Sequence, residues 1–142
     1  MLDRKTVNQL VGCLSAAMAA MSILFAFQVD VFAGDNDMSV VAHASSGPLV
    51  CEIRKTSAGD AVQLTGIVSS SVALSGQARF VLTKSGQTGN SNISQGKAFT
   101  LAAGADDHVS HVTIDLGHDD HAAVELLVTS QDGLTCRATG NL

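Results

Sequence analysis

The chain has 142 residues and a formal net charge of −5, with 13 acidic residues against eight Lys and Arg. It contains no Trp or Tyr, and only Phe80 and Phe99 are aromatic beyond residue 33. Nucleic-acid-binding surfaces rely on basic stripes and on aromatic side chains that stack with bases. This acidic composition, poor in aromatic residues, therefore argues against a nucleic acid as partner.

Residues 1–33 are typical of a secretory signal peptide. Arg4 and Lys5 form a basic start, residues 10–27 are an uncharged apolar run, and residues 31–33 (VFA) fit a cleavage site. The alternative is a permanent transmembrane anchor, because an apolar run of this length can just span a bilayer. We expect cleavage, which predicts an exported protein with no stable membrane association.

Two cysteines lie beyond this leader, Cys51 and Cys136. In an exported protein such a pair is expected to form a disulfide, whereas in a cytosol both would more often be free thiols. On the entropic model, closing this loop stabilises the fold by roughly 4–5 kcal/mol. A redox-active site is less favoured, because no Cys-x-Cys or Cys-x-x-Cys occurs. We predict a structural Cys51–Cys136 bridge.

After the leader, short runs alternate apolar and polar residues with a period of two, as strands with one buried face do. Gly66 indicates a bend or bulge in one run, and Gly96 is expected to break another. The pattern predicts an all-β, immunoglobulin-like antiparallel sandwich of seven or eight short strands over residues 48–142, with a small barrel as the alternative. Residues 34–47 are small and polar, and we expect a flexible lead-in there. The predicted strands are 49–55, 61–68, 76–84, 93–101 (interrupted), 110–116, 122–129 and 134–138.

Two histidine pairs are candidate metal ligands, since imidazole and carboxylate suit Zn²⁺ or Cu²⁺. His108 and His111 are three apart in a predicted strand, so they are expected to point to opposite faces. His118 and His121 lie in an acidic loop and remain weak candidates, so we predict no metal site and no cofactor. The chain has neither a Gly-x-Ser-x-Gly motif nor a phosphate-binding glycine loop, so we expect no enzymatic activity.

Two segments in the middle of the chain resemble a known family. Residues 75–86 (SGQARFVLTKSG) and 91–99 (SNISQGKAF) are similar to the CsgC/CsgH-like family of curli-assembly chaperones. The likeness extends over most of residues 49–137 and includes a leading cysteine, a closing cysteine and a signal peptide. CsgC carries a Cys-x-Cys pair that this chain lacks, so no redox role is carried over.

The resemblance implies an immunoglobulin-like sandwich in the periplasm that keeps major and minor curli subunits from polymerising into amyloid before export. We expect the protein to be a monomer. Amyloid grows when an exposed strand edge templates the next chain, so a domain with charged edges can hold a subunit without extending it. Candidates for client contact are the basic and polar residues expected to point outward, although each could equally be an ordinary solvated side chain: Arg54, Arg79, Thr83, Lys84 and Lys97.

Two other functions are compatible with the sequence. The first is an exported adhesion or interaction domain that binds a partner through the same sheet and has no effect on amyloid. The second is a periplasmic metal-binding domain that uses the His-rich loops. A fibrillation assay separates the chaperone from the adhesion domain, and titration with Zn²⁺ and Cu²⁺ tests the metal-binding domain.

Overall fold

The computed structural model of the protein describes residues 37–142, and the predicted signal peptide lies outside these residues. The described part contains eight strands, none of them parallel to a neighbour, and no helix long and apolar enough to cross a membrane. The strands are β1 (Met38–Ser46), β2 (Leu49–Ala58), β3 (Ala61–Ser70), β4 (Leu74–Ser85), β5 (Ser91–Leu101), β6 (Asp106–Asp115), β7 (His121–Ser130) and β8 (Thr135–Asn141).

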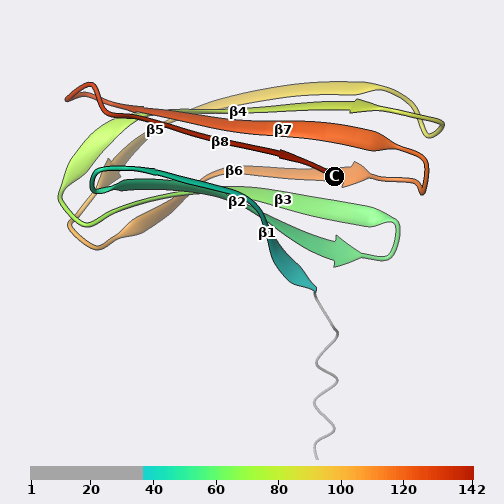
Figure 1. The fold of residues 1–142 in the computed structure, drawn as a ribbon, viewed down its shortest axis with the longest axis horizontal. Helices are drawn as coiled ribbons and strands as arrows, with labels where there is room; N and C mark the ends of the chain where they lie inside the picture. The colour runs from blue at the N-terminus through green and yellow to red at the C-terminus, as the bar shows by residue number, and fades with distance from the viewer. Residues whose placement is uncertain (1–36) are drawn as a thin grey trace, which may run out of the picture. The chain divides into compact units, whose positions relative to one another are not determined.

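The strands form two four-stranded sheets that pack face to face (Figure 1). Sheet A has the order β1-β2-β3-β6, and sheet B has the order β5-β4-β7-β8. The chain crosses between the sheets after β3, β5 and β6, so neighbours within a sheet are often distant in sequence. This arrangement confirms the predicted all-β, immunoglobulin-like antiparallel sandwich.

The core lies between the sheets and is built from alternate residues of each strand. Along β4, burial alternates strictly from Leu74 to Lys84, as the period of two requires. Phe80, on β4, is 1% exposed, and Phe99 is also buried. The other side chains of the core are mostly aliphatic and include Leu49, Ile53, Leu64, Leu82, Leu126 and Val128.

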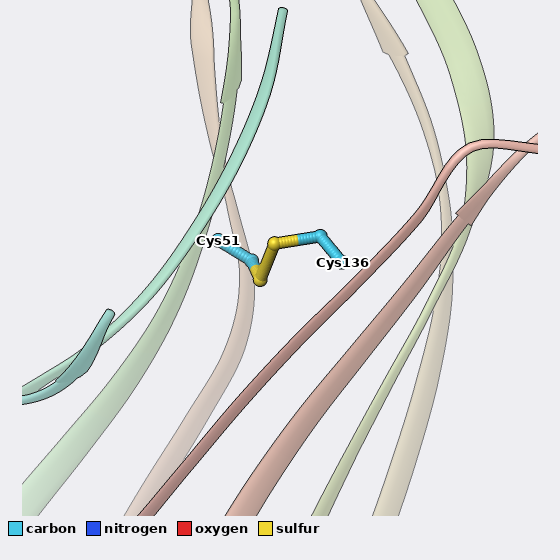
Figure 2. Close-up of a disulfide and its surroundings, with 2 residues drawn as sticks. All are labelled: Cys51 and Cys136. Atoms are coloured by element: carbon cyan, nitrogen blue, oxygen red, sulfur yellow. A yellow bond between two sulfur atoms is a disulfide. The ribbon is translucent and has the colours of Figure 1, made fainter. Parts of the chain in front are cut away.

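The predicted disulfide between Cys51 and Cys136 is present, and both residues are buried. Cys51 belongs to β2 of sheet A and Cys136 to β8 of sheet B, so the bridge joins the two layers through the core (Figure 2). The two residues are 85 positions apart. Covalent closure of so long a segment removes many conformations from the unfolded chain.

The expected flexible lead-in over residues 34–47 is wrong for Met38–Ser46, which forms β1. This strand pairs with β2 through a tight turn at Gly47, whose φ is +58°. Ala42 on β1 is buried against the core and Val41 packs beside it. The segment is rich in Ser and Ala and has little strand propensity of its own, so its pairing with β2 determines its structure.

The expected break at Gly96 is also wrong, because β5 runs without interruption from Ser91 to Leu101. Gly96 pairs with Arg79 in a regular ladder, and its φ is not positive. The predicted irregularity at Gly66 is confirmed, since the register between β3 and β6 shifts between Gly66 and Ile67. Adding an extra residue on one strand shifts the ladder in this way and bends the edge.

Candidate interaction surface

The residues predicted to contact a client fall on separate surfaces of the domain. Arg79 and Thr83 are both exposed on the outer side of β4, which lies inside sheet B between β5 and β7 (Figure 1). Arg54 lies on β2, on the outer side of sheet A. Lys97 lies at the β5 edge, and Lys84 is buried. Only Arg79 and Thr83 are therefore brought onto one face.

On the outer side of sheet B, the small residues Ser94 and Gly96 of β5 lie beside Arg79. Arg79 lies opposite Gly96 on one neighbouring strand and Leu127 on the other. Its Nε donates to Ser94 Oγ at 3.4 Å, a long contact that leaves most of the guanidinium available. We call this surface the β4 face and define it by the outward residues Gln77, Arg79, Val81, Thr83, Ser94, Gly96, Glu125, Leu127, Arg137 and Thr139.

Two shallow hollows lie on the β4 face. One, of about 330 Å³, lies beside Arg79 and is lined by Gln77, Ser94, Gly96 and Leu127 among others. The other, of about 350 Å³, lies along Val81 and Thr83 and reaches Glu125 and Thr139. Because Gly96 has no side chain and Ser94, on the same side of β5, is small, the backbone of an extended chain can approach the sheet closely here.

The charge of the β4 face has the opposite sign to that of the whole protein. Arg79 and Arg137 contribute two positive charges and Glu125 one negative charge, which leaves an excess of one positive charge on a chain of −5. Arg137 Nη1 lies 3.7 Å from Glu125 Oε2. Arg137 was not among the residues predicted to contact a client, although its position beside the inward Cys136 already indicated that it points outward.

Arg54 is held in a different environment. Its Nε donates to Glu52 on the same outer side of sheet A, and the two side chains are 44% and 17% exposed. The paired charges largely cancel, and an exposed pair of this kind stabilises the fold little. Arg54 is therefore separate from the β4 face in both position and charge.

The expectation that Lys84 points outward is wrong. Lys84 shares the inward side of β4 with Phe80 and Leu82, and it is 5% exposed. Its Nζ lies 3.1 Å from Asp120 Oδ2 and also donates to the Thr88 hydroxyl. A charge buried at this end of the core has to be paired and hydrogen-bonded, and Asp120 and Thr88 meet that requirement.

Asp120 joins two turns around this lysine. Its carboxylate accepts hydrogen bonds from the Thr88 hydroxyl, from the Gly117 N–H at 3.0 Å and from the Thr88 N–H at 3.2 Å. The bond from the Thr88 hydroxyl is the largest cause that holds the pKa of Asp120 well below its ordinary value of 3.8. The two backbone bonds and Lys84 lower the pKa further, while burial opposes them. Asp120 is therefore ionised at neutral pH, and the cluster has a structural role.

The histidines do not converge on one site. His108 and His111 are both exposed, so the expectation that they point to opposite faces is wrong. The register shift opposite Gly66 places two successive buried residues, Val109 and Ser110, between them. His118 is exposed and lies 3.3 Å from Asp119, and His121 begins β7. Within residues 37–142, no three His, Cys, Asp or Glu side chains are grouped to hold a metal ion.

A family model described as the CsgH protein matches residues 50–139. The chain belongs to the CsgH family. The match includes both bridged cysteines and the strands that make up the β4 face, and it leaves out β1. It agrees with the resemblance to the curli-associated CsgC/CsgH-like proteins that the central segments indicated.

Two solved structures are similar to this CsgH-family chain. The solution structure of R. palustris CsgH is 26% identical, with a TM-score of 0.52 over 66% of this chain and 90% of that one. The E. coli curli protein CsgC is 16% identical, with a TM-score of 0.54 over 70% of this chain and 97% of that one, a likeness that shows the fold alone. No protein among the curated sequences matches the chain.

Proposed function

We propose that this CsgH-family protein is a non-catalytic periplasmic chaperone that binds curli-type amyloid subunits, major and minor, through the β4 face and delays their polymerisation before export. Membership of a curli-associated family supports the choice of client. The choice of the β4 face as the binding surface rests on one observation: Arg79 lies beside two hollows and the small residues Ser94 and Gly96, on one face of an otherwise acidic domain.

The β4 face suits brief contact with an extended chain. Its residues lie on the outer side of sheet B, and the central strands β4 and β7 have their backbone groups already bonded within the sheet. A client held on this side meets side chains and not a free strand edge, so the contact does not template another strand. Arg79 and Arg137 supply charge-assisted hydrogen bonds to client carboxylates or amide oxygens.

The proposed function is tested by fibrillation of a purified curli subunit, followed by thioflavin fluorescence. Wild-type protein is expected to lengthen the lag phase. Arg79→Glu replaces attraction to client carboxylates by repulsion. We expect the affinity for the subunit to fall about tenfold, a loss of about 1–2 kcal/mol in binding free energy, and the lag phase to be correspondingly shorter.

Arg54→Glu is the matched control, because it reverses the charge of an exposed arginine on the opposite sheet. We expect it to retain the wild-type lag, and both variants to unfold at the wild-type temperature. If Arg79→Glu inhibits as well as wild type does, the β4 face is not the binding surface. If wild-type protein leaves the lag unchanged, the chaperone function itself is refuted.

A further inference from the structure

The strands β5 and β6 are edge strands of different sheets, and they lie beside each other at one side of the sandwich. Within the described residues no backbone ladder joins them. A shallow groove follows this seam and is lined by residues of both strands, among them Gln95, Gly96, Lys97 and His108. An edge strand such as β6 normally presents free N–H and C=O groups that another chain can pair with.

On β6, the side chain of Gln95 reaches the edge-facing N–H and C=O of His111 through two long contacts. The His111 N–H donates to Gln95 Oε1 at 3.4 Å, and Gln95 Nε2 donates to the His111 carbonyl at 3.4 Å. One carboxamide thus donates and accepts at a single residue, as the backbone of an added antiparallel strand would. Gln95 therefore stands in for a missing strand at this point.

Lys97 occupies a second backbone group on the same edge. Its Nζ donates to the His108 carbonyl at 3.1 Å and lies 2.9 Å and 3.0 Å from the two carboxylate oxygens of Asp107. The ion pair with Asp107 holds the ammonium over the carbonyl. Lys97 was predicted to contact a client, and here its donors are already used within the domain.

The bulge between these two contacts disturbs the edge further. Gly66 donates its N–H to Ser110 Oγ at 3.0 Å, so a side chain replaces a backbone acceptor in the β3–β6 ladder. Val109 and Ser110 both turn inward, and the strand bends. A bulge of this kind is one of the ways in which edge strands avoid pairing.

We propose that Gln95 and Lys97 form a clasp that closes the β6 edge against pairing with the β6 edge of a second copy of this chain. β6 is ten residues long, and His108 and His111 both direct backbone groups to its edge. Antiparallel pairing of two copies centred between Val109 and Ser110 therefore places His108 opposite His111 and Asp106 opposite Thr113. That register sets no two acidic residues opposite each other, and the edge-facing groups of His108 and His111 meet on either side of the two bulges, so the clasp is the main barrier to a second copy. This inference does not depend on curli subunits being the client.

The test compares wild type with Gln95→Ala/Lys97→Ala. Hydrogen exchange of the His111 amide is measured by NMR at low concentration, and association by sedimentation over a range of rising concentrations. We expect the amide to exchange about fivefold faster in the variant, as loss of about one hydrogen bond implies. We also expect the variant to dimerise with rising concentration while wild type stays monomeric.

Two further variants make the result specific. Gln77→Ala/Arg137→Ala removes an amide and a cation from the outer side of sheet B and is expected to stay monomeric. His111→Pro, added to the clasp variant, removes the outward N–H and is expected to abolish dimerisation, because proline is tolerated at an edge whose N–H faces away from the sheet.

The proposal is overturned if the clasp variant stays monomeric with an unchanged His111 exchange rate. It is also overturned if the sheet B variant dimerises equally, or if His111→Pro leaves the dimer intact. Should the double variant fail to fold, Gln95→Ala alone is used, since it removes only atoms at the surface seam. An unchanged His111 exchange rate in that single variant then counts against the clasp.

Discussion

Removing the Cys51–Cys136 bridge is expected to cost a large share of the stability of the domain. The bridge closes a segment in which the two cysteines are 85 residues apart. The entropic model assigns about 4–5 kcal/mol to a loop of this length. Single domains have net stabilities of about 5–15 kcal/mol, so Cys51→Ala/Cys136→Ala should fold but be only marginally stable.

The assay is urea unfolding at neutral pH with linear extrapolation to water. Besides the loss in free energy of unfolding, we expect a larger m-value, because an unfolded chain without the bridge is less compact and exposes more surface. A reductant should destabilise wild type by a similar amount and leave the Ala variant unchanged. A loss of less than about 1 kcal/mol would refute the entropic reasoning.

Two further predictions concern single side chains. Because the pKa of Asp120 is lower in the folded protein, the ionised carboxylate stabilises the fold above its ordinary pKa of 3.8, and this stabilisation is lost as the pH falls below that value. In urea unfolding from neutral to acidic pH, Asp120→Asn should therefore lose less free energy of unfolding than wild type does. Equal losses would contradict the low pKa of Asp120. A Cβ at Gly76 would lie 2.8 Å from Ser130 Cα, whereas a Cβ at Gly96 would be no closer than 3.9 Å to the Ala78 carbonyl oxygen, an ordinary contact. Gly76→Ala should therefore lower the free energy of unfolding by about 1–3 kcal/mol and Gly96→Ala hardly change it, as thermal or urea unfolding measures. Equal effects would show that the close backbone approach at Gly76 is unimportant.

The sandwich could be predicted because apolar and polar residues alternate with a period of two in most strands. In β4 it identified Ala78, Phe80 and Leu82 as core residues, and all three are buried. The same alternation places Lys84 inward, but its charge favoured an outward assignment. Only the tertiary structure brings Asp120, 36 positions along the chain, to Lys84 and makes burial of the ammonium possible.

Other errors arose where pairing decides the structure. β1 has no aromatic residue and only Val40 and Val41 as β-branched residues, and it forms because β2 pairs with it. At His108 and His111, one bulge reversed the alternation, and Gly66 was the sole indication of it in the sequence. The contact of Gln95 with His111 depends on two sheets meeting at their edges, which no local pattern in β5 or β6 reveals.

Binding of the client to the β4 face can be followed residue by residue in an NMR titration. Isotope-labelled protein is titrated with unlabelled, freshly unfolded curli subunit, and amide shifts are followed residue by residue. We expect the shifts to concentrate at Gln77, Arg79 and Thr83 and at their neighbours on β5 and β7, while the amides of Arg54 and its neighbours on sheet A stay unchanged. Shifts confined to sheet A would contradict binding at the β4 face. So would an absence of shifts at subunit concentrations at which the protein inhibits fibrillation.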